Sequence, residues 1–274
     1  MNHSTGDLEY TALAMARLED VRPGTVTWVD VQTPDLERAR NFYGELFGWS
    51  FPGAGDPAAG YIFAELGGRK AAGMAKLGPG AKVRPMWSVY LATDDADATA
   101  RAALQAGGRA LITPMDVTDQ GRMAYFEDPT GALFGVWQGR AHRGAEVSGE
   151  PGAMAWHEVY SRDVGAARAF YGAVFDLESR RLDAPDIEYW TLHRGSQVVC
   201  GAMQMPSHFQ PEAPSHWNTY FAVSGVDASV ARLISLGGSL VAPAFDTPFG
   251  RLAFVADPFG AAFCLIHPIR LPGS

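Results

Sequence analysis

The sequence is poor in the features that mark secreted, membrane-spanning and nucleic-acid-binding chains. Its only two cysteines, Cys200 and Cys264, lie in apolar, strand-like runs, so we expect buried free thiols and no disulfide. No stretch reaches the about 18 apolar residues of a membrane span, and the first twenty residues lack a basic segment followed by an apolar one. The net charge is −8, and no dense basic stripe is present. We therefore expect a cytoplasmic protein that binds neither nucleic acid nor a membrane.

An internal repeat divides the chain into two similar halves. The phrase "ARNFYGELFGW" begins at Ala39, and "ARAFYGAVFDL" begins at Ala167. Without a gap, residues 28–47 match 156–175 at nine of twenty positions. The match resumes at "PMWSVYLATDDADA" against "SHWNTYFAVSGVDA", and again at "GRMAYFEDPTGALFGVWQ" against "GRLAFVADPFGAAFCLIH". We predict an N-terminal extension at 1–22, domains at 23–138 and 152–268, each long enough to bury its own core, and a linker at 139–151.

Each half has the same predicted order of elements. "TVTWVDV" alternates as a strand, and "TPDLERARNFYGELFGW" then has helical spacing, with Thr33 as its N-cap and Gly48 at its end. A second helix is predicted in "DDADATARAALQAGG", and "DPTG" has the composition of a tight turn. The further strands predicted in the first half are 61–66, 71–77, 87–92, 123–127 and 133–138. The fold class is therefore α+β.

The repeated motifs carry a family resemblance. They read "D-L-x-x-A-x-x-F-Y-x-x-L-F-G-W", "V-x-D-x-D-A" and "F-x-D-P-x-G-x-x-F", and they occur in this order in both halves. This arrangement resembles the vicinal oxygen chelate superfamily of glyoxalases, bleomycin-resistance proteins and extradiol dioxygenases, and within it the two-domain actinobacterial branch labelled glyoxalase-like or hydroxylase. The resemblance implies tandem βαβββ modules, which form two glyoxalase-like domains, each with a sheet curled around a cleft.

The resemblance also implies a divalent metal held by histidine and glutamate side chains in a cleft, but the corresponding positions here hold other residues. They are Trp28, Ser88, Gly135 and Met74 in the first half, and Trp156, Asn218, Cys264 and Met203 in the second. None is a histidine or a carboxylate. We therefore expect neither a metal nor another cofactor.

Strand parity indicates what lines the clefts instead. Residues i and i+2 share a face of a strand, so Trp28 and Asp30 should point into the first cleft, and Trp156 and Glu158 into the second. Asp30 and Glu158 are the predicted catalytic residues. The predicted ligand-binding residues are Trp28, Met74, Ser88, Tyr90, Trp137, Trp156, Met203, His216, Asn218 and Tyr220. The alternative is that the tryptophans are core aromatics and the carboxylates are structural hydrogen-bond acceptors.

Parity also sorts the remaining histidines. His157 lies between Trp156 and Glu158, so it should face the opposite, helix-covered side of its strand. The lone histidines at 142, 193 and 208 lie in polar or strand-edge contexts, and we expect them to be solvated.

Two function classes fit these residues. In the first, the protein is a metal-independent enzyme of lyase, isomerase or hydroxylase type, which acts on a small aromatic or polyketide-type metabolite by acid–base chemistry of Asp30 or Glu158. In the second, it is a non-catalytic protein that binds and sequesters such a metabolite, as bleomycin-resistance proteins do. Both predict a small-molecule ligand as the partner, and both leave a homodimer open.

Overall fold

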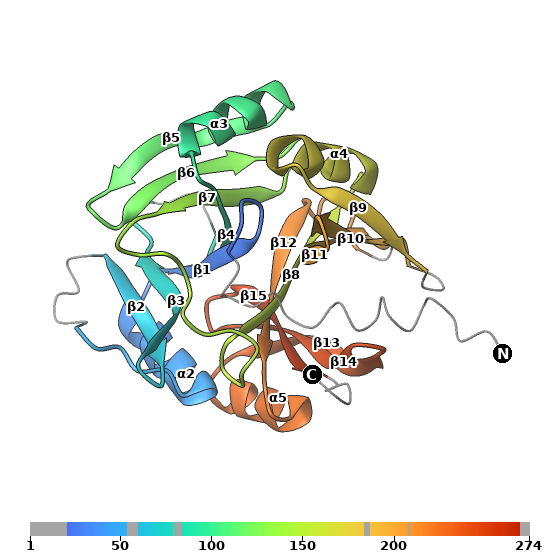
Figure 1. The fold of residues 1–274 in the computed structure, drawn as a ribbon. Helices are drawn as coiled ribbons and strands as arrows, with labels where there is room; N and C mark the ends of the chain where they lie inside the picture. The colour runs from blue at the N-terminus through green and yellow to red at the C-terminus, as the bar shows by residue number, and fades with distance from the viewer. Residues whose placement is uncertain are drawn as a thin grey trace.

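Each half of the chain forms one mixed β-sheet with two helices (Figure 1). The computed structural model describes residues 21–53, 60–78, 80, 84–183, 187–207 and 209–268. The first half contains β1 (Val26–Thr33), α2 (Leu36–Phe47), β2 (Tyr61–Leu66), β3 (Arg69–Lys76), β4 (Met86–Ala92), α3 (Ala96–Gln105), β5 (Arg109–Val117), β6 (Gly121–Glu127) and β7 (Leu133–Gly139). The second contains β8 (Met154–Ser161), α4 (Val164–Phe175), β9 (Glu178–Leu182), β10 (Tyr189–Arg194), β11 (Gln197–Gln204), β12 (His216–Ala222), α5 (Val226–Ser235), β13 (Ser239–Thr247), β14 (Gly250–Ala256) and β15 (Ala262–Pro268). No helix among these described residues is long and apolar enough to cross a membrane.

The two sheets have the same topology. The first has the strand order β2-β3-β1-β4-β7-β6-β5, and the second has β10-β11-β8-β12-β15-β14-β13, with β9 added beside β10. β1 runs parallel to β3 and antiparallel to β4, as β8 does to β11 and β12. In the first half, an isolated bridge between Ser50 and Glu65 stands where β9 lies in the second. The predicted α+β fold of tandem βαβββ modules is confirmed.

The start of the first helix differs from the prediction. Its N-cap is Asp35, whose carboxylate accepts a hydrogen bond from the Arg38 backbone N–H at 3.0 Å, whereas Thr33 is the last residue of β1. Pro34 suggested the earlier start because proline favours the first position of a helix. The predicted end at Gly48 is confirmed, since Gly48 adopts a left-handed φ of 74° there.

Strand β5 was not predicted. It lies at the edge of the first sheet, where it pairs only with β6, and most of its side chains are exposed. A strand with no buried face shows no alternation of apolar and polar residues, and Pro114 within it argues against a strand.

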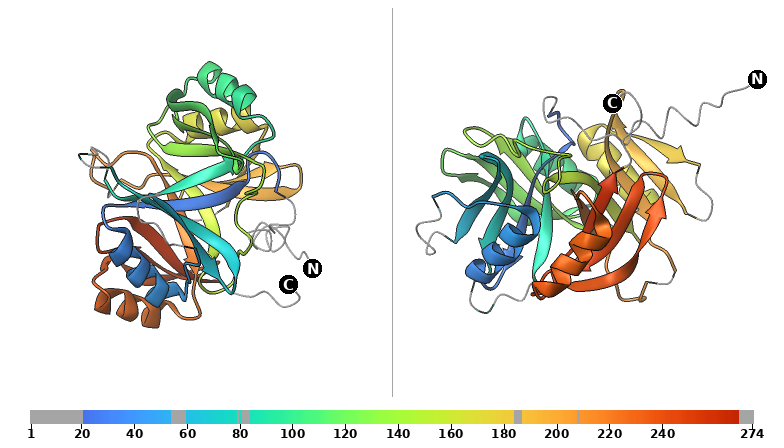
Figure 2. Two further views of the ribbon diagram at one scale, coloured as in Figure 1. Left: turned by 90° about the vertical axis from the view of Figure 1, so that its left-hand side faces the viewer. Right: turned by 90° about the horizontal axis from the view of Figure 1, so that it is seen from below.

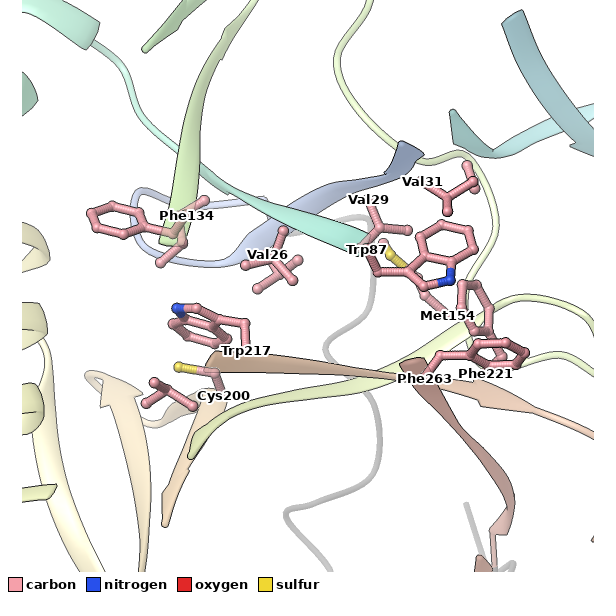
Figure 3. Close-up of a cluster of buried hydrophobic side chains, with 14 of the residues drawn as sticks. Val26, Val29, Val31, Trp87, Phe134, Met154, Cys200, Trp217, Phe221 and Phe263 are labelled. Atoms are coloured by element: carbon pink, nitrogen blue, oxygen red, sulfur yellow. The ribbon is translucent and has the colours of Figure 1, made fainter. Parts of the chain in front are cut away.

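The two halves share one hydrophobic core, although each is long enough to bury a core of its own. Figure 3 shows Val29 and Trp87 of the first half facing Phe221 and Phe263 of the second, and these residues belong to one continuous buried cluster. Helices α2 and α5 lie side by side at one end of the molecule, and α3 and α4 lie side by side at the other (Figure 2). The domain boundaries themselves stay predictions.

The repeated "FY" and "DP" motifs meet across the two halves. The Tyr43 hydroxyl on α2 donates a hydrogen bond to Asp257 Oδ2 at 3.0 Å, and the Tyr171 hydroxyl on α4 donates one to Asp128 Oδ2 at 2.9 Å. Both tyrosines are fully buried. Each motif therefore finds its partner in the opposite half, which explains why both motifs occur twice.

Each of these tyrosine–aspartate contacts extends into a small network. Trp87 and Trp217 donate their indole N–H groups to the Tyr43 and Tyr171 hydroxyls, at 3.2 and 2.8 Å. In the Asp128 turn, Oδ1 accepts the backbone N–H groups of Thr130 and Ala132. One carboxylate thus orders its own turn and the partner half's helix at the same time.

We expect Tyr171→Phe to lower the free energy of unfolding by about 1–3 kcal/mol, because it leaves Asp128 Oδ2 buried without its hydroxyl donor. In urea denaturation, the double variant with Asp128→Asn should lose less than the sum of the two single losses, since both remove the same contact. Ser235→Ala, which removes an exposed hydrogen bond, is the control and should change stability by less than about 0.5 kcal/mol. Additive losses would show that the contact between the halves contributes nothing.

Candidate functional site

The first site is built around the carboxyl group of Asp30. Trp28 and Asp30 lie on the face of β1 that points away from the shared core, as parity predicted. Tyr61 of β2 joins them: its hydroxyl accepts the Trp28 indole N–H at 2.7 Å and donates to Asp30 Oδ2 at 3.3 Å. The tyrosine lies across Gly73, where a Cβ atom would come within 2.0 Å of the Tyr61 hydroxyl. Glycine is therefore required at this position.

The second site repeats this arrangement around Glu158. The Tyr189 hydroxyl accepts the Trp156 indole N–H at 3.0 Å and donates to Glu158 Oε2 at 2.6 Å. It lies across Gly201, where a Cβ atom would come within 2.2 Å of that hydroxyl. Tyr61 and Tyr189 were missed in the sequence. They are separated by the same 128 residues as the other repeated positions, and that spacing was the available signal.

A second tyrosine completes each site. Tyr220 donates its hydroxyl to Glu158 Oε1, whereas Tyr90 lies near Asp30 and leaves Asp30 Oδ1 buried without a hydrogen-bond partner among the described residues. Tyr90 occupies the space over Gly135, where a Cβ atom would come within 2.2 Å of its ring. In the second half, Cys264 stands opposite Tyr220 on the neighbouring strand. Both cysteines are free and buried, as predicted.

Burial controls the protonation of these groups. Desolvation raises the pKa of Asp30 from 3.8 to about 6, although the nearby hydroxyl groups of Tyr90, Tyr61 and Ser88 oppose the rise. Desolvation likewise raises the pKa of Glu158, against hydrogen bonds from its two tyrosines and Trp156. The pKa values of the tyrosines are raised by burial and then by the adjacent carboxylate, so their hydroxyls remain donors.

Of the two methionines placed in the clefts, only Met203 lies on a site face. Met74 pairs in register with Val31 and lies in the shared core, so its prediction as a ligand-binding residue is wrong. The two methionines were treated as equivalent, but the register of Gly73 and Gly201 makes Ala75 the counterpart of Met203. A shift of one residue moves a side chain to the other face of a strand.

The other predicted residues of the first site lie with it. The Ser88 hydroxyl accepts a hydrogen bond from Tyr125 at 3.0 Å. The Trp137 ring belongs to the cluster of Trp28 and Tyr90.

In the second site, Asn218 and His216 differ in exposure. Asn218 is buried beside Glu158, its register partner on β8, and its Nδ2 has no hydrogen-bond partner among the described residues. His216 is partly exposed, with its ring 5.6 Å from that of Tyr160. The second site therefore offers one unused, buried amide donor next to its carboxyl group.

The lone histidines were predicted to be solvated, and for two of them this is wrong. His142 is buried among aromatic rings, where desolvation lowers its pKa to about 4, and His193 is buried against Thr191. His208 lies outside the described residues. His157 is buried on β8 between Trp156 and Glu158, and burial lowers its pKa to about 3.

The donor set does not fit a divalent metal. Among the described residues, the second site holds Glu158, the buried thiol of Cys264 and the partly exposed imidazole of His216, and the first holds Asp30 and the buried imidazole of His142, but in neither do three such groups converge. Across the part of the chain that the structure describes, no group of three or more histidine, cysteine or acidic residues is placed to hold a metal ion.

Comparisons with known proteins identify related chains. A family model described as the Glyoxalase/Bleomycin resistance protein/Dioxygenase superfamily matches residues 25–136, and one described as a Glyoxalase-like domain matches residues 156–266. The chain is 38% identical over 260 residues to "Putative glyoxylase CFP32" of Mycobacterium tuberculosis, covering 93% of this chain and 98% of that protein. It is also 38% identical over 259 residues to "Anthracycline biosynthesis protein DnrV" of Streptomyces peucetius, covering 89% and 94%.

Solved structures share the fold at low sequence identity. The Mn(II)-bound glyoxalase from Novosphingobium aromaticivorans aligns with a TM-score of 0.63 and 16% identity, covering 91% of this chain and 83% of that one. The 2,2',3-trihydroxybiphenyl 1,2-dioxygenase from Sphingomonas wittichii aligns with a TM-score of 0.62 and 15% identity, covering 92% and 93%.

The raised pKa of Asp30 predicts a specific pH dependence of stability. Because the folded state holds the proton more tightly, the stabilisation is complete below pH 3.8 and is lost as the pH rises through about 6. Between pH 4 and 7, wild type should lose about 2 kcal/mol of unfolding free energy relative to Asp30→Asn in urea titrations. Tyr125→Phe changes the same site but keeps the carboxyl group, so its unfolding free energy should vary with pH in parallel with that of wild type. If the unfolding free energies of Asp30→Asn and wild type vary with pH in parallel, the raised pKa of Asp30 is disproved.

The donor set also predicts the metal content. After dialysis, elemental analysis should find well below one equivalent of Zn, Fe, Mn or Ni per chain, because no described side chains form a closed or open metal site. One equivalent of metal that is lost on substitution of Glu158 or Cys264 would contradict this expectation.

Proposed function

The chain belongs to the glyoxalase/bleomycin resistance protein/dioxygenase superfamily, and from that premise we propose that it is a metal-independent enzyme acting on a small aromatic metabolite by proton transfer in the second site. The observation that carries the proposal is the environment of Glu158. This carboxyl group is buried, is oriented by Tyr189 and Tyr220, and lies beside the unused donor of Asn218.

The chemistry follows from these neighbours. A carboxyl group whose pKa is raised by burial exchanges protons closer to neutral pH, as a general acid or base requires. Glu158 takes a proton from a ring carbon that is conjugated with a ligand carbonyl group, while the Asn218 amide donates a hydrogen bond to the carbonyl oxygen as it gains negative charge. Both roles belong to side chains that face each other across β8 and β12.

The surroundings favour an aromatic ligand. Trp156 is partly exposed beside Glu158, and the apolar side chains of Leu252 and Ile266 pack in the same cluster. Aromatic and apolar walls with a few convergent polar groups are typical of small-molecule sites. A Streptomyces relative carries the name of an anthracycline biosynthesis protein, and anthracyclines contain fused aromatic rings with ketone groups. We therefore take an aromatic polyketide ketone as the substrate class.

Sequestration of the same ligand class is the second candidate function. Both oxygens of Glu158 already accept hydrogen bonds from tyrosines. Such a fixed carboxyl group can line a binding site without transferring protons. In that case the protein binds its ligand without turnover.

A carbon acid of this class separates the two functions. With 1,8-dihydroxyanthrone in D2O, the enzyme should accelerate deuterium incorporation at the methylene carbon above the buffer rate, as measured by mass spectrometry. Glu158→Gln should lower this rate by about 10²-fold or more while keeping most of the affinity. Asp30→Asn removes the equivalent carboxyl group of the other half and should change the rate by less than about threefold.

Each remaining outcome has a definite meaning. Binding of the anthrone without any accelerated exchange supports sequestration. Accelerated exchange that survives Glu158→Gln contradicts the role of Glu158, whereas a larger loss with Asp30→Asn would move the chemistry to the first site.

A further inference from the structure

The first site already contains a planar ring, and the chain itself supplies it. The His142 imidazole packs edge-to-face on Trp28, with ring centroids 4.4 Å apart, and lies 5.1 Å from Phe63 and 5.5 Å from Trp137. It is buried, and neither ring nitrogen has a hydrogen-bond partner in the described part of the chain. An imidazole without polar partners fills this space as a flat ring and not as a hydrogen-bonding group.

The segment that carries His142 is tied firmly to the first sheet. The backbone N–H of Ala145 donates to the Thr27 carbonyl at 2.8 Å, and that of Glu146 donates to the Lys70 carbonyl at 2.7 Å. Gly144 has a φ of 122°, and a Cβ atom there would come within 2.1 Å of the Thr27 hydroxyl. Such a close approach needs glycine, so residues 142–146 form a fixed cover over the first site.

The second site differs at the equivalent positions. Trp156 matches Trp28 but is partly exposed, and it packs against the cluster of Tyr220, Leu252 and Ile266. By the repeat, Thr191 stands in place of Phe63, and Ile266 in place of Trp137. Both replacements are smaller than the side chains that contact His142 in the first site.

We propose that the His142 imidazole marks the position at which the second site binds a planar ring of its ligand. The ligand ring then lies edge-to-face on Trp156, next to the Tyr189 and Glu158 pair, and the smaller Thr191 and Ile266 leave room for fused rings. The first site is a copy closed by its own chain, so one chain binds one ligand. This inference rests on the proposed function for the ligand class only.

The test uses 1,8-dihydroxyanthraquinone as a non-exchanging planar probe, counted by native mass spectrometry and titrated by tryptophan fluorescence. Wild type should bind one probe per chain. Trp156→Ala should weaken binding at least tenfold, because the ring contact is lost, whereas Trp28→Phe in the closed site should change affinity less than threefold. His142→Ala should add a second bound probe, and the exposed His267→Ala should not.

Several results would overturn the proposal: two probes on wild type, one probe that survives Trp156→Ala, or no probe at all. If His142→Ala fails to fold by near-ultraviolet circular dichroism, His142→Phe keeps a ring in the first site and must still bind a single probe that depends on Trp156. Exchange of the anthrone that depends on Glu158 but not on Trp156 would overturn this inference alone. Loss of the Glu158 dependence, with one probe still bound on Trp156, would overturn the proposed proton transfer alone.

Discussion

The buried hydrogen bonds between Tyr43 and Asp257 and between Tyr171 and Asp128 determine how the rest of the molecule is arranged. Each joins a helix of one half to a turn of the other, so the two sheets must turn their helix-covered faces toward each other. The shared core fills the space between them. A charged partner is costly to bury without compensation, and here each aspartate also orders its own turn through backbone N–H groups.

This arrangement frees the opposite face of each sheet for a site. On β1 and β8, alternate residues serve the two purposes: Val29 and Val31 pack in the core, while Trp28 and Asp30 face outward. Burial of the carboxyl groups there depends on tyrosines from neighbouring strands, and these tyrosines need glycine beneath them at Gly73 and Gly201. Each sheet therefore brings together a carboxyl group, a tyrosine and a tryptophan, and the set occurs twice because the two sheets have the same strand order.

Local patterns in the sequence predicted the repeat, most helices and strands, and the sharing of one face by Trp28 and Asp30, because these depend on spacing along one strand or helix. What was missed depends on contacts distant in the chain. Tyr61 reaches Asp30 from another strand, and His142 is buried only because its segment returns to the first sheet. Met74 was misplaced because strand parity changes with a one-residue error in alignment, and β5 because an exposed edge strand has no buried face.

The two sites contain nearly the same polar groups, so the carboxyl group alone does not distinguish them. In the first, Asp30 is joined to Trp28 through the Tyr61 hydroxyl, a buried histidine ring packs on Trp28, and the raised pKa of Asp30 lowers stability above pH 6. In the second, the equivalent tryptophan keeps part of its surface exposed, and Asn218 keeps an unused donor beside the carboxyl group. Proton transfer to a ligand requires a carboxyl group that the ligand can reach and a free hydrogen-bond donor beside it. The two halves therefore differ in what covers the tryptophan, while both contain the hydrogen-bonded carboxyl group and tyrosine beside it.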